Sequence, residues 1–374
     1  MNNLNDARDK ILQIDKEIAC LFEKRMNLVK TISEYKTEYS LPIFDPKREA
    51  ELIKNISACI KNSEIREYYI LLEKNIIGCS RKYQHRLFSG MNVAYSGIEG
   101  AFAAIAAEEI FPDSNRKSYP DFESAYLSVV KGECDCVALP IENSYAGEVG
   151  AVLDLIFTGE LYITGMFDLS VTQNLLGLPD SQISDIKKVI SHSHALVQCE
   201  KYIRQNGFET ENEVNTAVAA KKIAENGDKT VAAIASKKTA ELYGLKLLAE
   251  NINSENINTT KFAILSRALP NINSDDEYNS AVMFTVSHEA GSLANAISII
   301  GKYGYNMCTL CSRPRKSLQW NYYFYVEVNG NLNTKNGQNM MSELKRYCSA
   351  LKLIGIYKHI NCLETEAENY GNKG

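Results

Sequence analysis

Two cations share one face of the first predicted helix, where an apolar residue is expected. Residues 4–36 carry apolar side chains every three or four positions without Gly or Pro, which predicts one long helix with an apolar seam. Arg25 interrupts that seam, and Lys36 follows eleven residues later, about 20° away in helical phase. A single arginine could lie along the surface with its charge in water. Two cations on one helix face favour an anion-binding site if polar groups of other elements lie close to them.

Such polar groups occur on the next two predicted helices. Asp45-Pro46 predicts the N-cap and first residue of a second helix that reaches about residue 61, and Ser63 begins a third that reaches about residue 86. The polar residues are Asp45, Arg48 and Glu49 at the start of the second helix, and Ser80 and Gln84, an i, i+4 pair on the third. Together with the two cations they suit a small dianion that carries a hydroxyl.

Arg8 belongs to this group only if a second chain contributes it. It lies about 25 Å from Arg25 along the helix axis and about 100° away around it. One small ligand cannot contact both residues of one straight helix, so a site containing both requires two chains.

A hydroxyl pair marks a second candidate site, in the stretch NTTKFAIL at residues 258–265. Phe262 to Leu265 reads as a buried strand, preceded by Thr259, Thr260 and Lys261. These residues either begin a strand in the ordinary way or hold a hydroxyl at the mouth of a site. The local sequence leaves both interpretations open.

Three modules must position these residues. Residues 1–87 form a three-helix all-α module, and residues 91–268 alternate short apolar runs with helical stretches, which is typical of α/β folds. The apolar runs are at 92–95, 134–139, 161–165, 187–191, 231–235 and 262–266. After a polar linker at 268–280, residues 280–360 have the ferredoxin-like order βαββαβ. Its elements are expected at 282–287, 291–303, 305–311, 320–328, 338–349 and 351–357.

The composition and charge of the chain argue against several classes of function. The 374 residues suggest two to four domains, and the net charge of −5 argues against bulk attraction to nucleic acid. The first residues lack the pattern of a signal peptide, and no apolar run is long enough to span a membrane. Ten cysteines read as reduced, buried thiols of a cytoplasmic protein. Cys134/Cys136 and Cys308/Cys311 lack further ligands nearby, so no metal is expected.

The helical module resembles the all-α chorismate mutases at eight positions in order and spacing: Arg8, Arg25, Lys36, Asp45, Arg48, Glu49, Ser80 and Gln84. The resemblance implies an intertwined helical dimer in which one arginine crosses from the partner, in agreement with the distance argument for Arg8. It assigns Lys36 and Gln84 to the ether oxygen of chorismate, the three arginines to its carboxylates, and Glu49 to its ring hydroxyl. The rearrangement needs positioning and electrostatic stabilisation, without a nucleophile or metal.

The middle module resembles prephenate dehydratases through YSGIEGAF (95–102), LPIENSYAG (139–147), SHSHALVQC (191–199) and TTKF (259–262). Thr260 aligns with the catalytic threonine of the family, and Lys261 replaces an arginine. Taken alone, His192 and His194 are more often structural than catalytic. The resemblance implies two α/β lobes around a cleft, with Thr260 as proton donor. The residues expected around prephenate are Asn143, Ser144, Gln198, Thr216, Thr260 and Lys261.

The last module resembles an ACT domain, a βαββαβ unit that binds amino acids. AGSL (290–293) and CSRP (311–314) match its turns, with Cys311 in place of a glutamate. The resemblance implies a phenylalanine site made by Gly291, Ser292, Leu293, Ser312, Arg313 and Pro314.

These resemblances predict a cytoplasmic bifunctional enzyme, a homodimer or higher homo-oligomer. It would convert chorismate to prephenate and then to phenylpyruvate, with inhibition by phenylalanine. No cofactor, nucleic acid or membrane is expected. Two rival hypotheses are a non-catalytic amino-acid sensor and an interaction protein whose helices serve only dimerisation. Both predict no turnover of chorismate.

Overall fold

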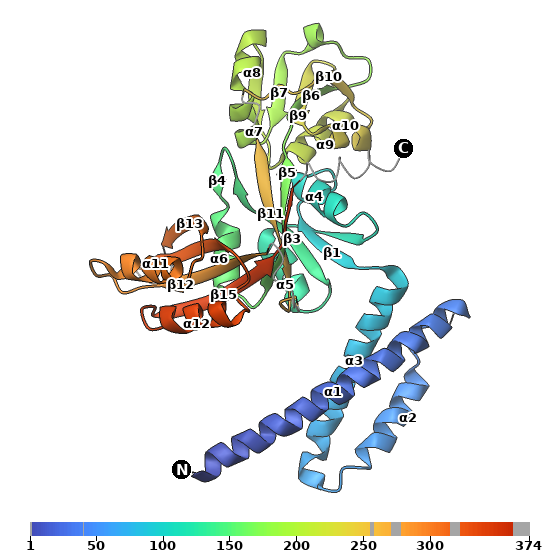
Figure 1. The fold of residues 1–374 in the computed structure, drawn as a ribbon. Coiled ribbons are helices and arrows are strands. Elements are labelled where there is room, and N and C mark those ends of the chain that lie inside the picture. The colour runs from blue at the N-terminus through green and yellow to red at the C-terminus, as the bar shows by residue number, and fades with distance from the viewer. Residues whose placement is uncertain (1, 40, 255–257, 271–277, 315–321, 362–374) are drawn as a thin grey trace, which may run out of the picture. The chain divides into compact units, whose positions relative to one another are not determined.

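The chain divides into two compact units, Met1–Met91 and Asn92–Gly374. The computed structural model describes residues 2–39, 41–254, 258–270, 278–314 and 322–361 (Figure 1). Most of the expected linker at 268–280, the start of the strand expected at 320–328, and Cys362 therefore lie outside the described residues.

The first unit consists of three helices, as the apolar periodicity predicts. They are α1 (Asn2–Glu38), α2 (Pro46–Ser57) and α3 (Ser63–Ser89). The Asp45 side chain caps α2 by accepting from the Arg48 backbone N–H at 3.1 Å, with Pro46 in the first turn. The expectation that α2 reaches residue 61 is wrong, because the chain turns at Ala58 and residues 58–62 connect the helices.

This helical unit has little apolar core of its own. Val29 and Ile77 are the only apolar side chains among its described residues that are classed as buried. Large apolar side chains of α1 stay exposed in the single chain, among them Leu4, Ile11, Ile14, Ile18, Leu21 and Leu28. Such a seam is typical of helices that pack against a further helical surface.

The second unit begins with two α/β lobes. The first lobe contains β1 (Asn92–Ser96), α4 (Phe102–Ile110), β2 (Asn115–Tyr119), α5 (Phe122–Val130), β3 (Cys136–Asn143), β4 (Gly147–Glu148), α6 (Gly150–Thr158), β5 (Tyr162–Ser170) and β11 (Thr259–Ser266). The second contains β6 (Asn174–Gly177), a 3-10 turn (Ile183–Asp185), β7 (Lys188–Ser191), α7 (Ser193–Gln198), α8 (Glu200–Asn206), β8 (Glu209–Asn212), α9 (Thr216–Asn226), β9 (Val231–Ala235), α10 (Lys237–Tyr243) and β10 (Lys246–Ala249). The chain crosses between the lobes after β5 and before β11 (Figure 1).

The βαββαβ unit is present in the expected order. It comprises β12 (Asn279–Thr285), α11 (Ser292–Lys302), β13 (Met307–Pro314), β14 (Tyr322–Asn329), α12 (Lys335–Leu344) and β15 (Ala350–Tyr357), followed by β16 (His359–Asn361). Its strands lie in the order β13-β14-β12-β15, the ferredoxin-like arrangement. Val282 and Phe284 pack under α11 and α12, whereas Ala281 and Met283 face the first lobe.

The sheet does not end at the expected module boundary. β15 and β16 both pair with β5, so one sheet runs β13-β14-β12-β15-β5-β11-β3-β1-β2, while the second lobe has its own sheet, β10-β6-β9-β7-β8. Tyr323 and Tyr325 of β14 belong to the same buried cluster as Leu139 and Ile163 of the first lobe. The strand that carries Thr260 is thus part of the sheet that includes the βαββαβ unit.

The expectation that the cysteines are buried is correct only in part. Cys134, Cys136 and Cys199 are buried, but Cys20, Cys59, Cys79 and Cys308 are exposed. Three of these exposed thiols lie in the helical unit, where one chain offers little core to cover them. None of the cysteines in the described part of the chain forms a disulfide.

Candidate functional sites

A cavity of about 750 Å³ lies among the helices of the first unit. We call it the helical cavity. Seven of the eight residues predicted for this site line it: Arg25, Lys36, Asp45, Arg48, Glu49, Ser80 and Gln84. Arg8 is exposed on α1 and does not line the cavity. The structure of one chain therefore brings together every predicted group except the one assigned to a partner.

Neighbouring groups orient two of the cations in the helical cavity. The Arg25 guanidinium donates to Ser80 Oγ and lies 4.0 Å from Glu73 Oε1, a carboxylate whose side chain is 7% exposed. Lys36 Nζ donates to the carbonyl oxygen of Ile43 at 2.7 Å, which ties the end of α1 to the connection before α2. Both cations are held at the cavity wall before any ligand arrives, which lowers the cost of ordering them on binding.

Sequence reasoning missed a further cation at this cavity. Arg81 lines it, with Nε 3.6 Å from Glu49 Oε1 and Cζ 4.9 Å from the centre of the Phe44 ring. No periodicity marks Arg81, because it is one position from Ser80 and therefore about 100° around the helix. Four cations against two carboxylates, Asp45 and Glu49, make the cavity wall net positive. That balance favours a dianionic ligand.

Gln84 presents a buried amide to the same cavity. Its Nε2 is 3.4 Å from the Ser80 carbonyl oxygen, a long hydrogen bond, and its Oε1 has no partner within the described residues. An amide that is held this weakly can turn toward a ligand at little cost.

A second cavity, of about 470 Å³, opens between the two α/β lobes. We call it the lobe cavity. Four of the six residues predicted around prephenate line it: Asn143, Gln198, Thr216 and Thr260. They come from β3 and β11 of the first lobe and from α7 and α9 of the second.

Asn143 orients the hydroxyl of Thr260. Backbone N–H groups of Tyr145 and Ala146 donate to Asn143 Oδ1 at 3.0 and 2.9 Å, so the other end of this amide must be Nδ2. Asn143 Nδ2 donates to Thr260 Oγ1 at 2.9 Å. Because Oγ1 accepts this bond, the Thr260 O–H proton is directed elsewhere and can be donated to a ligand.

Ser144 and Lys261 do not line the lobe cavity, contrary to the prediction. Ser144 Oγ accepts from the Thr259 backbone N–H at 3.0 Å. Lys261 follows Thr260 on β11, and successive strand residues face opposite sides. Its Nζ lies 3.1 Å from Glu142 Oε2 and 3.8 Å from Glu327 Oε1. Burial lowers the pKa of Lys261, but Glu327 and Glu142 outweigh that effect, so the pKa is raised.

Helix N-termini border the lobe cavity, and Glu148 is the one carboxylate among the described residues that line it. Residues at the starts of α4, α6, α7 and α9 line it, and no lysine or arginine of the described chain does. The N-caps of α4 and α6, Ala101 and Val149, make no side-chain capping bond. Backbone N–H groups at such helix starts are well suited to bind carboxylates.

The lobe cavity also includes residues that sequence reasoning did not assign to it. Gln173, His192 and Asn215 are among them. Burial, helped by nearby His194, lowers the pKa of His192, which also caps α7 by accepting from the His194 N–H at 3.3 Å. The lowered pKa favours the neutral imidazole, whose Nδ1 accepts this bond. The one sequence feature that could have assigned Gln173 to this cavity is the strand β6 that directly follows it. That strand was not predicted.

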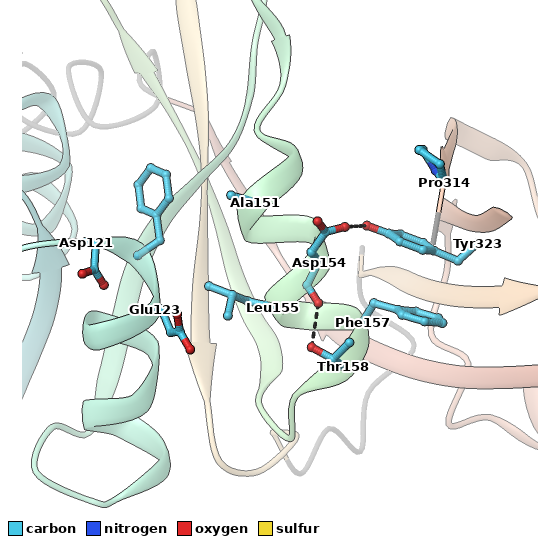
Figure 2. A pocket seen from close by; sticks show the side chains of 10 residues that line it. Asp121, Glu123, Ala151, Asp154, Leu155, Phe157, Thr158, Pro314 and Tyr323 are labelled. Atoms are coloured by element: carbon cyan, nitrogen blue, oxygen red, sulfur yellow. Dashed lines mark hydrogen bonds between the residues drawn. The ribbon is translucent and has the colours of Figure 1, made fainter. Parts of the chain in front are cut away.

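The residues predicted to bind phenylalanine lie at two places in the βαββαβ unit. Gly291 is the N-cap of α11 with φ 86°, and Leu293 packs into the core under that helix. At the end of β13, Pro314 lines a separate cavity of about 530 Å³ between α5, α6 and β14 (Figure 2). The neighbouring Arg313 packs on Gly150. Figure 2 shows the Tyr323 hydroxyl donating to Asp154 Oδ1 at 2.7 Å in this cavity. Gly291, Ser292 and Leu293 do not line it.

The described residues contain no group of three or more His, Cys, Asp or Glu side chains suited to a metal ion. In those residues, no helix combines the length and apolar character needed to cross a membrane.

Comparison with known proteins matches both units. The family model described as chorismate mutase type II matches residues 7–85, and the model described as prephenate dehydratase matches residues 93–269. A bifunctional chorismate mutase/prephenate dehydratase of Aquifex aeolicus (strain VF5) is 31% identical over 366 residues, covering 96% of this chain and 98% of that protein. A protein of the same description from Buchnera aphidicola subsp. Acyrthosiphon pisum (strain APS) is 29% identical, covering 95% and 96%.

A solved structure resembles the second unit. The prephenate dehydratase of Arthrobacter aurescens in complex with L-Phe is 28% identical, with a TM-score of 0.65, and the match covers 71% of this chain and 89% of that one. Each matched region of the present chain contains one of the two polar cavities described above.

Proposed function

The chain belongs to the bifunctional chorismate mutase/prephenate dehydratase family, and we propose that its two polar cavities carry the two activities in turn. The helical cavity converts chorismate to prephenate. The lobe cavity converts prephenate to phenylpyruvate, carbon dioxide and water. The assignment of one activity to each cavity rests on one observation. Each region matched by a family model contains its own cavity, and that cavity is lined by the residues that the reaction requires.

The residues that line the helical cavity promote the reaction by electrostatic stabilisation and by positioning the substrate. The reaction breaks the ether C–O bond and forms a C–C bond in one rearrangement, so no proton is transferred. Partial negative charge grows on the ether oxygen in the transition state, and Lys36 with Gln84 donates to that oxygen. Arg25 and Arg48 hold the carboxylates, and Glu49 accepts from the ring hydroxyl. Donors that are already aimed at developing charge lower the barrier most effectively.

Gln84 must turn its amide to take part. Its Nε2 now donates at 3.4 Å to the Ser80 carbonyl, and its Oε1 has no partner in the described residues. Turning the amide toward the ether oxygen gives up only this long bond, and chorismate supplies a better acceptor.

Arg8 completes the helical cavity from a second chain. The apolar residues exposed along α1 support a homodimer in which another helical unit covers them. An Arg8 side chain of that unit would reach the cavity, which the same chain's Arg8 cannot do along a straight helix.

In the lobe cavity, helix N-termini and amides bind the dianion and Thr260 supplies the proton. The bond from the ring to its carboxylate breaks, and its electron pair enters the ring as carbon dioxide departs. The ring C–O bond then breaks with its pair on oxygen, which takes the Thr260 proton and leaves as water. Thr260 recovers a proton from solvent. The hydrogen bond from Asn143 Nδ2 to Thr260 Oγ1 supports this role because it leaves the O–H proton available and stabilises charge on the oxygen.

The βαββαβ unit is proposed to be an ACT domain that binds phenylalanine and inhibits the dehydratase. The relative from Arthrobacter aurescens was solved in complex with L-Phe, and the family motif positions correspond to Gly291, Ser292 and Leu293 with Ser312, Arg313 and Pro314. Because these two groups lie apart in one chain, a site that uses both would be completed by a second chain. The proposal includes no cofactor or metal, and it retains the cytoplasmic location predicted from the sequence.

Separate assays of the two steps test the proposal. Chorismate supplied to the intact chain should yield prephenate and then phenylpyruvate, and prephenate supplied alone should yield phenylpyruvate. A chain that binds these compounds without converting either would be the amino-acid sensor of the rival hypothesis.

A further inference from the structure

Four buried or half-buried amides connect the catalytic threonine to the opposite lobe. They belong to Asn143, Asn258, Gln198 and Gln173, which we call the amide network. Asn258 directly precedes β11, and Gln173 directly precedes β6, so these two lie where the chain passes between the lobes. Both are nearly inaccessible, with exposed fractions of 6% and 3%.

In each amide of this network, the hydrogen bonds made by one end show which atom is the oxygen and which is the nitrogen. Asn143 Oδ1 accepts two backbone N–H groups, so Asn143 Nδ2 must be the donor to Asn258 at 2.8 Å. The atom that accepts is Asn258 Oδ1, which leaves Asn258 Nδ2 to donate to Gln198 Oε1 at 3.0 Å. An amide has one accepting end and one donating end, so each bond determines the next.

Gln173 makes a second hydrogen bond to the same side-chain oxygen of Gln198. Gln173 Nε2 donates to Gln198 Oε1 at 3.3 Å. With two donors on its oxygen, the Gln198 amide has its Nε2 group left as the donor for a ligand in the lobe cavity, which Gln198 lines. Gln173 Oε1 meanwhile has no partner among the described residues.

On the premise of the proposed dehydratase activity, we infer that Asn258 is a positioning residue that orients two substrate-facing groups at once. The Asn143 amide is anchored by the backbone and also lies 3.2 Å from the Thr259 carbonyl oxygen. By accepting one Asn143 N–H at 2.8 Å, Asn258 leaves the other N–H to Thr260 Oγ1 of the first lobe. Through Gln198 it orients an N–H donor of the second lobe. Gln173 supports only the second of these. The two substrate-facing groups are thereby oriented together, although they come from different lobes.

Two variants separate the two branches of the network. Asn258→Ala breaks both, so kcat for prephenate should fall about tenfold or more and KM should rise. Gln173→Met removes one support of Gln198, so KM for prephenate should rise several-fold and kcat should fall less than in Asn258→Ala. The same substitution at Gln205, which is exposed on α8, is the matched control and should change neither constant.

Mutase activity of the same chains reports on the helical unit, whereas thermal unfolding reports on the second unit, which carries the substitutions. The mutase activity should stay at the wild-type level in all three variants, because the helical unit is untouched. Wild-type turnover of prephenate tests the proposed function, and the ratio of each variant to wild type tests the network. Wild-type kcat and KM in Asn258→Ala would overturn the inference. It would equally be overturned if the variants lost dehydratase activity together with the thermal stability of the second unit, since that result indicates a purely structural role.

Discussion

Lys261 Nζ lies 3.8 Å from Glu327 Oε1, so an ion pair links the strand that carries Thr260 to the central strand β14 of the βαββαβ unit. The two side chains are 20% and 4% exposed, and Glu142 completes the group at 3.1 Å from Lys261. A change in the βαββαβ sheet can therefore act directly on Lys261, the neighbour of Thr260 on β11.

Lys261→Met should destabilise the second unit by about 3 kcal/mol, because it leaves the buried Glu327 carboxylate without its cation. The double variant Lys261→Met/Glu327→Gln should recover most of that loss, since the second change removes the unpaired charge. Urea unfolding of the two variants and of wild type measures the difference. Equal unfolding midpoints for Lys261→Met and wild type would show that the ion pair contributes nothing.

The pH dependence of this contribution has a definite sign. The pKa of Lys261 is raised above its ordinary 10.5 by Glu327 and Glu142, in spite of burial. A cation with a raised pKa in the folded state stabilises fully below its unfolded value and loses that contribution as the pH rises through the folded value. The advantage of wild type over Lys261→Met should therefore be constant from pH 7 to 9 and shrink only above pH 10.5.

Lys36→Ala should lower mutase turnover by about a hundredfold or more, the usual loss when one preorganised donor to a developing charge is removed. Dehydratase activity on supplied prephenate should be retained, because the lobe cavity is unchanged. Lys47→Ala is a matched control, since this exposed lysine lies on α2 and does not line the helical cavity. Near-normal mutase turnover in Lys36→Ala would exclude this residue from the mechanism.

Arg8 should act on the helical cavity of the partner chain. Arg8→Ala and Lys36→Ala chains are each expected to be nearly inactive as mutases. After subunit exchange, mixed dimers contain one cavity with both residues intact, so part of the activity should return. Exchange is verified with differently tagged chains, and verified exchange without recovery would contradict the crossed arrangement.

Thr260→Ala should abolish dehydratase turnover while chorismate is still converted, so that prephenate accumulates. Thr260→Ser keeps a hydroxyl in reach of Asn143 and should keep part of the rate. Thr259→Ala is the neighbouring control, because Thr259 does not line the lobe cavity. If Thr260→Ala matched wild type, the threonine pair would be no more than the start of a strand.

Gly291→Ala should weaken inhibition by phenylalanine. The φ of 86° at Gly291 is unfavourable for a residue with a Cβ, so the start of α11 must shift. Dehydratase rate and phenylalanine binding are measured together, since inhibition depends on the difference in affinity between two states. Persistence of wild-type inhibition in this variant would remove the α11 turn from the site. A wild-type chain that neither binds nor responds to phenylalanine would end the regulatory proposal while leaving the catalytic one intact.

The sequence by itself determined most of the elements and much of both cavities. The long helix α1, the Asp45-Pro46 start of α2 and the βαββαβ order follow from local periodicity and capping, which act over a few residues. Seven of eight residues predicted for the helical cavity line it, because fixed helical spacing brings residues such as Ser80 and Gln84 to one face. The strands β2, β4, β6, β8, β10 and β16 were missed, since short strands carry a weak apolar signal.

Only the tertiary structure determines which residues contact each face of β11. Alternation requires Thr260 and Lys261 to face opposite sides, but the choice of sides depends on pairing with β3 and β5, and the register with β3 shifts between Lys261 and Phe262. The contacts of Gln173 with Gln198 and of Lys261 with Glu327 likewise join residues distant in sequence. Such contacts depend on how sheets and crossing segments pack, and one sequence carries no local pattern for that packing.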